Sequence, residues 1–267
     1  MSSRSRLNRG GTSVGAESQR RRPTVLFFGR EGCSRTREVL QLLEEHAHSV
    51  EFFESRHRGE KLPSRVTDWS GDFIFCFRSF HILSPQQISQ AAIGAINFHP
   101  GPPEYPGSGC INWALLEGAK QFGVTAHQIS EKIDSGKILA VDRFAIRPSD
   151  NIETLLSRTH EALGALALRV IDTIFSLDDS GLRAFLANEP TEHWSGKTRP
   201  VRELDKLRQV PIDISRRDLE NRIRAVHHPR FPLYVEVAGQ NFLFDDSGQP
   251  KLSDPTEPGG IAARTDD

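Results

Sequence analysis

Cysteine is scarce in this sequence, with Cys33, Cys76 and Cys110 among 267 residues. An odd number of cysteines without a CxxC pair excludes the disulfide framework of a small secreted protein, so we expect a reducing, cytoplasmic environment. Long apolar runs are also lacking. Residues 73–77 form one of the longest, far short of the ~20 apolar residues of a membrane-spanning helix. The composition therefore excludes a membrane protein, and the length fits one large or two small domains.

Neither sign of charge dominates the sequence, whose net charge is −1, but its two ends differ. Residues 1–22 carry six arginines and one acid, and residues 245–267 carry six acids and two bases. Both ends are too poor in apolar residues to offset the entropy of ordering. We therefore expect a disordered basic tail over 1–22 and a disordered acidic tail over 246–267. An Arg- and Ser-rich start is also typical of an organelle targeting segment, and this alternative stays open.

Short apolar runs alternate with helical patterns between the tails. Each run has the length of a buried strand, and the stretches between them carry apolar residues at helical spacing. This alternation predicts an α/β fold with a mostly parallel, twisted sheet. The expected strands cover residues 24–28, 50–53, 73–77, 95–98, 124–129 and 138–146; the expected helices cover 36–47, 86–92 and a long stretch from 152 to 175.

The C-terminal part predicts a small subdomain over residues 201–245. Residues 216–226 have the pattern of a basic helix, residues 233–244 that of a hairpin, and residues 204–214 are ambiguous. The long helix before it has Asp150 and Glu153 at the spacing of a capping box, so we expect Asp150 to cap it. The basic helix, rich in arginine, is suited to contact a diphosphate.

Polar residues that carry chemistry follow the fourth expected strand. Asn97 and His99 are two residues apart, so they lie on the same face of that strand. A loop with four prolines and two glycines over residues 100–107 follows. Further along, the fifth expected strand is followed by a loop with Asp134. Because open α/β sheets bind ligands at the carboxyl ends of their strands, we expect these side chains to line a site.

Three motifs in this region resemble the formyltransferases that use 10-formyltetrahydrofolate. The motifs are Asn97-Phe98-His99, the sequence GVTAH ending at His127, and the sequence DSGKI beginning at Asp134. That family includes glycinamide ribonucleotide, methionyl-tRNA and sugar N-formyltransferases. The resemblance runs over residues 24–180 and implies a Rossmann-like catalytic domain over 23–200. It departs from the tRNA and sugar enzymes after His99: those enzymes usually continue His-x-Ser-Leu-Leu-Pro, whereas Pro100-Gly101-Pro102-Pro103 follows His99 here.

The resemblance implies catalytic roles for Asn97, His99 and Asp134. An amine attacking a formyl carbon creates an oxyanion that needs fixed donors, and the Asn97 amide and the His99 imidazole are suitable. His99 can also move the proton between the amine and the folate nitrogen if Asp134 supports its ring. A metal set of His99, His127 and Asp134 is disfavoured, because these residues lack a metal-ligand spacing such as HxxxH. We expect no metal.

The family's folate pocket maps onto two loops of this chain. Glu104, Tyr105 and His127 are candidates to contact the acceptor, although His127 is equally suited to hydrogen-bond the loop. Cys110 shows no base nearby in the sequence, so we expect it to be a packing residue. The expected folate-binding residues are Phe77, Arg78, Ser79, Phe80, Ile82, Leu83, Ser130 and Ile133.

Several functions are consistent with these motifs. We favour a transferase that formylates an amino-sugar nucleotide or another small amine, with 10-formyltetrahydrofolate as co-substrate. Methionyl-tRNA is a second acceptor, although a polyanion of that size favours a broader positive surface. The third alternative is a hydrolase in which water replaces the amine. The fourth is an idle binding module, which the intact Asn97, His99 and Asp134 disfavour. No DNA or membrane partner is expected, and a homodimer is left open.

Overall fold

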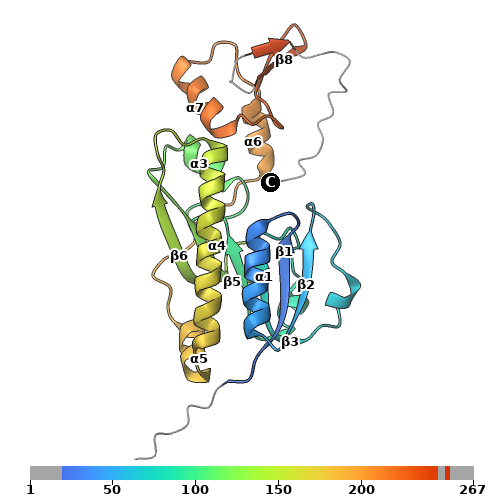
Figure 1. The fold of residues 1–267 in the computed structure, drawn as a ribbon. Coiled ribbons are helices and arrows are strands. Elements are labelled where there is room, and N and C mark those ends of the chain that lie inside the picture. The colour runs from blue at the N-terminus through green and yellow to red at the C-terminus, as the bar shows by residue number, and fades with distance from the viewer. Residues whose placement is uncertain (1–19, 246–249, 253–267) are drawn as a thin grey trace, which may run out of the picture.

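A six-stranded sheet forms the centre of the molecule, as Figure 1 shows. The computed structural model describes residues 20–245 and 250–252. The sheet has the order β2-β1-β3-β4-β5-β6, and of its strands only β5 runs opposite to the others. The predicted mostly parallel α/β fold is confirmed. Its strands are β1 (Thr24–Arg30), β2 (Ser49–Ser55), β3 (Gly71–Phe77), β4 (Ala91–His99), β5 (Gln121–Gln128) and β6 (Ile138–Ala145).

The two faces of the sheet are covered differently. Helices α1 (Ser34–His46) and α4 (Ile152–Ser176) pack on one face, which Figure 1 turns toward the viewer. Strands β1, β3 and β4 are rich in phenylalanine, whose rings fill the core beneath these helices. A smaller core lies on the other face, beneath the 3-10 helix η1 (Ser64–Val66) and the surrounding loops. Alternate residues of each strand therefore serve different layers.

Helix starts follow local capping chemistry rather than the expected boundaries. The long helix α4 is capped by Asn151, which exchanges hydrogen bonds with Thr154, so the prediction of Asp150 as the cap was wrong. Asp150 instead accepts from the Arg147 N–H and pairs with Arg158. Helix α2 (Pro85–Ile88) is shorter than the expected 86–92, because β4 already begins at Ala91. The sequence patterns did not reveal α3 (Cys110–Leu116), α5 (Asp179–Ala187) or α6 (Val201–Arg208).

The C-terminal part contains the expected helix and hairpin. Helix α7 (Arg216–Val226) precedes β7 (Tyr234–Val237) and β8 (Gln240–Phe244), and β9 (Pro250–Leu252) extends them into a three-stranded antiparallel sheet. In Figure 1 these elements lie beyond the carboxyl ends of β1 and β2. They share one apolar core with α3, β5 and α4, formed among others by Leu115, Phe122, Leu155, Val226 and Leu233. These C-terminal elements are thus packed firmly onto the part of the chain that forms the main sheet.

Most of the two expected tails lies outside the described residues. Three positions expected in the acidic tail form β9 instead, because they pair with β8. Residues 20–22 of the expected basic tail are described, and Arg21 binds both carboxylate oxygens of the buried Asp72. Within the described part of the chain, no helix is both long and apolar enough to cross a membrane.

Candidate functional site

The end of β4 and the adjacent end of β5 bring four polar side chains to one face of the sheet. On β4, Ile96 and Phe98 point into the phenylalanine-rich core, so Asn97 and His99 lie on the opposite face. The antiparallel register places Asn97 opposite His127 and His99 opposite Thr125. Directly opposite side chains are close enough to interact. The strand pairing therefore assembles part of the site before any loop contributes.

Asp134 joins this group from the loop between β5 and β6. Its Oδ2 lies 3.2 Å from His99 Nδ1 and its Oδ1 lies 3.3 Å from His127 Nε2. The Gly107 N–H donates to Asp134 Oδ2 at 2.8 Å. The backbone of Asp134 has φ +43°, in the left-handed region that Asp tolerates better than most residues. The structure thus brings together the three predicted catalytic residues and His127.

Burial and hydrogen bonding set the charges of this cluster. His99, His127 and Asp134 are 3%, 2% and 9% exposed, so their interactions are weakly screened. Burial alone would raise the pKa of the Asp134 carboxyl, but the two imidazoles and the Gly107 N–H lower this pKa to about 2. Burial lowers the pKa of His99, and the Asp134 carboxylate partly opposes that shift. Asp134 is therefore a buried anion beside two imidazoles.

His127 is a member of the cluster through hydrogen bonds on both ring nitrogens. Its Nε2 lies 3.0 Å from the amide nitrogen of Asn97, and its Nδ1 lies 2.8 Å from the Gln128 carbonyl oxygen. Of the two roles predicted for this residue, hydrogen bonding of the loop residue Asp134 agrees with these contacts. His127 also links Asn97 to Asp134, because its Nε2 lies near the side chains of both residues.

The loop after β4 closes around the free edge of the His99 ring. His99 Nε2 lies 3.1 Å from the Tyr105 carbonyl oxygen and 3.6 Å from Cys110 Sγ. A base therefore does lie beside Cys110, contrary to our expectation. Burial raises the pKa of the Cys110 thiol to about 12, so the thiol stays protonated and donates to the Gly107 carbonyl. Gly101 has to lack a side chain, since a Cβ there would come within 2.7 Å of His99 Nε2.

The residues expected to bind folate separate into exposed and buried groups. Ile82 and Ile133, one on each predicted loop, are 71% and 56% exposed. Phe77 and Leu83 are buried in the two cores, so their side chains serve packing. The others lie at the loop surfaces: Arg78 contacts Cys33 Sγ, Ser79 contacts Ser55, Phe80 lies under the Arg30 guanidinium, and Ser130 contacts Ser135.

The side chains of Glu104 and Tyr105 are not brought to the cluster of His99, His127 and Asp134. Glu104 forms an ion pair with Arg143, at 2.9 Å, and lies at the surface. The Tyr105 hydroxyl donates to Glu117 at the end of α3, so only the backbone carbonyl of Tyr105 faces His99. Contact of either side chain with an acceptor remains a prediction that these contacts do not favour.

One residue that contacts the cluster was not predicted. Trp194 lies between α5 and α6, with its ring centroid 5.6 Å from that of His99 and 5.0 Å from that of His127, in edge-to-face geometry. Its indole N–H donates to the Gly136 carbonyl at 2.7 Å. Nothing in the local sequence around Trp194 signals this contact, because the residue lies about sixty positions after Asp134 in a segment without periodicity.

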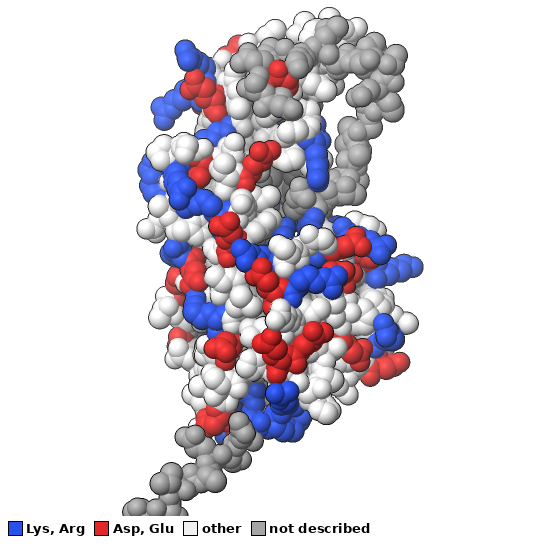
Figure 2. All heavy atoms as spheres, in the orientation of Figure 1, with Lys and Arg blue, Asp and Glu red and all other residues white. Residues whose placement is uncertain are grey.

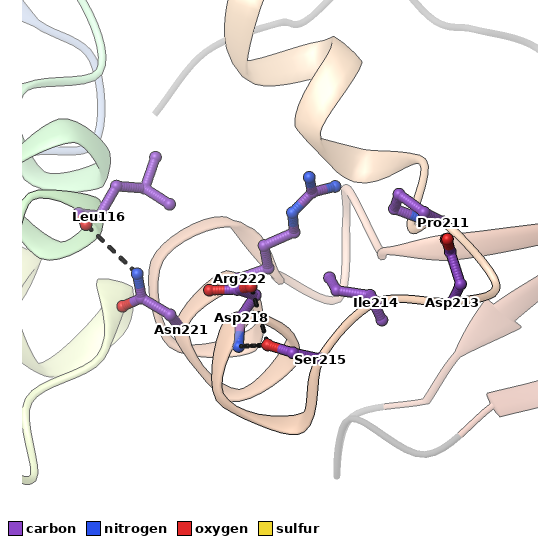
Figure 3. A pocket seen from close by; sticks show the side chains of 8 residues that line it. All are labelled: Leu116, Pro211, Asp213, Ile214, Ser215, Asp218, Asn221 and Arg222. Carbon is purple, nitrogen blue, oxygen red and sulfur yellow. Dashed lines mark hydrogen bonds between the residues drawn. The ribbon is translucent and has the colours of Figure 1, made fainter.

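A hollow lies elsewhere on the described residues, between α3 and the start of α7 (Figure 3). It measures about 540 Å³ and contains none of the predicted site residues. Figure 3 shows Asn221 of α7 pointing to Leu116, whose carbonyl accepts its hydrogen bond. Arg222 and Arg224 donate to backbone carbonyls of neighbouring segments. The basic helix thus uses these two arginines as structural ties, rather than offering them to a diphosphate as we expected.

Among the residues that the structure describes, no group of three or more His, Cys, Asp or Glu side chains is arranged to hold a metal ion.

Comparison with known families gives a match over the catalytic part. The model of the formyl transferase family matches residues 24–171, more than half of the chain. This match covers all the strands of the main sheet, the cluster of Asn97, His99, His127 and Asp134, and most of α4. It confirms the resemblance that the sequence motifs indicated.

Solved structures share the fold at low sequence identity. A sugar N-formyltransferase from a Shewanella species has a TM-score of 0.65 and 17% identity, with 86% of this chain and 99% of that chain covered. An N-formyltransferase from Helicobacter canadensis, in complex with folinic acid and dTDP-3-aminofucose, has a TM-score of 0.62 and 14% identity, with 82% and 85% covered.

A third similar structure is HypX from Aquifex aeolicus in complex with tetrahydrofolic acid. Its TM-score is 0.59 at 18% identity, and 84% of this chain is covered. This chain spans only 38% of the length of HypX. At these identities the three structures establish the shared fold.

Proposed function

This chain belongs to the formyl transferase family and is an enzyme of that family, and from this premise we propose that it transfers a formyl group from 10-formyltetrahydrofolate to a primary amine. The observation that carries the proposal is the buried cluster of Asn97, His99 and Asp134 at the carboxyl edge of the sheet, with Asp134 3.2 Å from His99 Nδ1. Ligand sites of open α/β sheets lie at this edge.

The reaction we propose divides the work among these three residues. The amine nitrogen attacks the formyl carbon, and the Asn97 amide with the His99 imidazole stabilises the oxyanion. His99 takes a proton from the amine and returns one to the folate nitrogen as the C–N bond of the donor breaks. Because Asp134 contacts Nδ1 of His99, Nε2 is the nitrogen that takes and returns the proton. Its contact with the Tyr105 carbonyl would break when substrate binds. Asp134 stabilises the imidazolium that forms.

Folate binding is supported by the exposed apolar residues of the two predicted loops. Ile82 and Ile133 expose most of their side chains to solvent and offer apolar surface for a ligand to cover. Ile82 follows β3 and Ile133 follows β5, the two strands that pair with β4. A pterin is flat and largely apolar, with polar edges that backbone groups of loops recognise. The folate complexes of the HypX and Helicobacter structures agree with this assignment.

For the acceptor we propose an amino-sugar nucleotide or another small amine with an anionic group. Arg30 ends β1, and Arg56, Arg58 and Arg78 lie on the loops that follow β2 and β3, at the same edge of the sheet as His99. Guanidinium groups bind phosphates in bidentate geometry. The Helicobacter structure holds such a nucleotide sugar, dTDP-3-aminofucose. The arginines at the strand ends, rather than those of α7, are our candidates to meet a diphosphate.

Methionyl-tRNA and water are the competing acceptors. A bound tRNA calls for a broad positive surface, because its affinity depends on many phosphate contacts. The face over α1 and α4, seen in Figure 2, is not such a surface, because Lys and Arg are interspersed there with Asp and Glu. A hydrolase would use the same three residues with water as the nucleophile, so only its product separates it from a transferase.

Product analysis tests the proposal. The protein is incubated with 10-formyltetrahydrofolate and, in separate reactions, amino-sugar nucleotides, small amines and aminoacylated tRNA, and the products are identified by mass spectrometry. We expect one acceptor to gain a formyl group, and we expect His99→Ala and Asn97→Ala to lower that rate at least ~100-fold. Formate released equally with and without every amine would refute the transferase and indicate the hydrolase.

A further inference from the structure

The segment between α5 and α6 reaches across the catalytic cluster. We name residues 189–200 the strap. Its Ser195 N–H donates to the Pro103 carbonyl at 2.9 Å, and the Ser195 hydroxyl donates to the Glu104 carbonyl at 3.0 Å. At its start, Glu192 pairs with Arg143 of β6. At its end, Arg199 forms a bridge with Gly107. The strap is therefore fastened to β6 before Trp194 and to the loop after β4 behind it.

Trp194 is the strap residue that meets the cluster. Its ring makes edge-to-face contacts with the His99 and His127 rings at interplanar angles of 75° and 85°. Such pairs hold two rings at a defined mutual orientation and contribute beyond the area they bury. The indole N–H also holds the Gly136 carbonyl, two residues after Asp134. One side chain thus restrains both imidazoles and the loop that presents their shared carboxylate.

We propose that Trp194 is a positioning residue, which fixes the His99 and His127 rings against Asp134 and keeps water away from that contact. This inference rests on the proposed function, because it assigns Trp194 a part in the same reaction. Charges shielded from water interact more strongly, so the Trp194 ring, by covering the cluster, strengthens the interaction between Asp134 and His99. Small displacements of reacting groups are costly, about 100-fold in rate for 1 Å.

The environment of His99 gives the sign of the expected pH effect. Asp134 faces its ring from the loop after β5, His127 from β5 and Cys110 from α3, while Trp194 covers it from the strap. Burial lowers the pKa of His99. Removing the indole admits water and therefore raises this pKa. Since the neutral ring accepts the proton of the amine, the acid limb of the rate profile should move to higher pH.

Two substitutions test the role in the full-length protein. We expect Trp194→Ala to lower kcat about 10- to 100-fold, to leave KM for the folate within about twofold, and to move the acid limb to higher pH. Trp194→Phe keeps an aromatic ring but loses the N–H, so it should keep the acid limb of the parent enzyme and have a kcat between those of the parent and Trp194→Ala. Wild-type kcat and an unchanged limb in Trp194→Ala would overturn the proposal.

Fluorescence gives a readout that needs no substrate. Of the three tryptophans, Trp69 and Trp113 are replaced by Phe, so that emission comes from Trp194 alone. A protonated imidazole quenches an adjacent indole, so emission should fall as the pH is lowered, and Asp134→Asn should move the midpoint to lower pH because a nearby anion favours the imidazolium. Emission that stays constant between about pH 4 and about pH 9 would overturn the contact.

These outcomes separate the two proposals. A parent enzyme that formylates no acceptor while its emission titrates as expected refutes the proposed function. Formyl transfer that Trp194→Ala leaves unchanged refutes only the role of Trp194. If Trp194→Ala does not fold, Trp194→Phe decides, because loss of the N–H alone should lower kcat measurably while circular dichroism stays that of the parent.

Discussion

Asp134 has a backbone conformation and a charge that both depend on its surroundings. Its left-handed φ is held by the loop, and its carboxylate is held ionised in a buried place by two imidazoles and one backbone N–H. A substitution removes the charge alone only if the new residue also tolerates the left-handed backbone conformation. Asn does so, whereas Ala adds strain.

We therefore predict that Asp134→Asn lowers kcat at least ~100-fold with little change in KM for folate, because the imidazolium loses its anion while the loop keeps its shape. Steady-state rates with the identified acceptor measure this. Asp142→Asn, which alters a surface ion pair with Arg169, is the matched control and should retain parent activity. If Asp134→Asn changes only folate affinity, Asp134 binds the donor and takes no part in proton transfer.

Acid should destabilise the folded protein through the same residues. A pKa lowered by folding contributes stability above the unfolded value, and this stability is lost as the pH falls through the folded value. For His99 the loss starts as the pH drops below 6.5, and for Asp134 it runs from about 3.8 to about 2. The share of Asp134 is about 2 kcal/mol.

Urea unfolding followed by circular dichroism at a series of pH values measures this dependence. The free energy of unfolding should fall on acidification, and the part between about pH 4 and about pH 2 should be smaller in Asp134→Asn. Identical curves for the two proteins would show that Asp134 has the same pKa in the folded and unfolded states.

The sequence allowed the central residues of the site to be predicted, but not their surroundings. Asn97 and His99 share a strand face because of their spacing, and the DSGKI motif pointed to Asp134. The contacts of Cys110 and Trp194 with His99 depend on how a loop closes and where a distant strap crosses. Neither leaves a periodic pattern, so neither could be foreseen.

At the scale of elements, the loop between β5 and β6 depends on a glycine. A Cβ at Gly136 would overlap the Gln128 carbonyl, which belongs to backbone that cannot move aside easily. The loop passes this close because the Gln128 N–H donates to the Lys137 carbonyl, at 2.8 Å. The position of Asp134 therefore depends on the missing side chain two residues later.

Gly136→Ala should lower both the melting temperature and kcat, the latter at least ~10-fold, because the loop has to shift and carries Asp134 with it. Thermal unfolding and steady-state rates measure the two effects. Gly94→Ala is the control: the nearest atom to its added Cβ is 4.0 Å away, so it should behave as the parent. Equal behaviour of both variants would show that the loop adapts without moving Asp134.

Helix α7 shows what periodicity can and cannot predict about an element. Its bounds, Arg216–Val226, agree with the predicted helix. The use of its arginines was not predictable, because carbonyl partners such as Asp150 O and Gln209 O come from segments that only the fold brings close. A charge pattern thus located the helix but misjudged its partner.

At the scale of the whole molecule, the C-terminal part and the catalytic part depend on each other. Helix α3 begins with Cys110, which touches His99, and its other apolar residues pack against α7 and Leu233. Removing the C-terminal elements would expose this core and release the helix that bears on the catalytic ring.

A chain that ends at residue 200 should therefore be insoluble or unfold without a cooperative transition, because it leaves Ile111, Leu115 and Phe122 uncovered. Solubility and thermal unfolding by circular dichroism measure this. A chain that ends at residue 252 keeps β9 and should match the full-length protein in both. A soluble, cooperatively folding and active 1–200 chain would show that the catalytic part is an independent domain.

The register between β4 and β5 ties correct folding to correct chemistry. Asn97 faces His127 and His99 faces Thr125, while Phe98 and Ala126, which alternate with them, pack into the apolar core. Slippage by one position would turn every side chain over, sending imidazoles inward and phenylalanine outward. A sheet with the slipped register would bury the imidazoles and expose the phenylalanines, and it would therefore be unstable. Molecules that form the stable sheet therefore also have Asn97, His99 and His127 in their places. The specific activity of a preparation should then be proportional to its fraction of folded molecules.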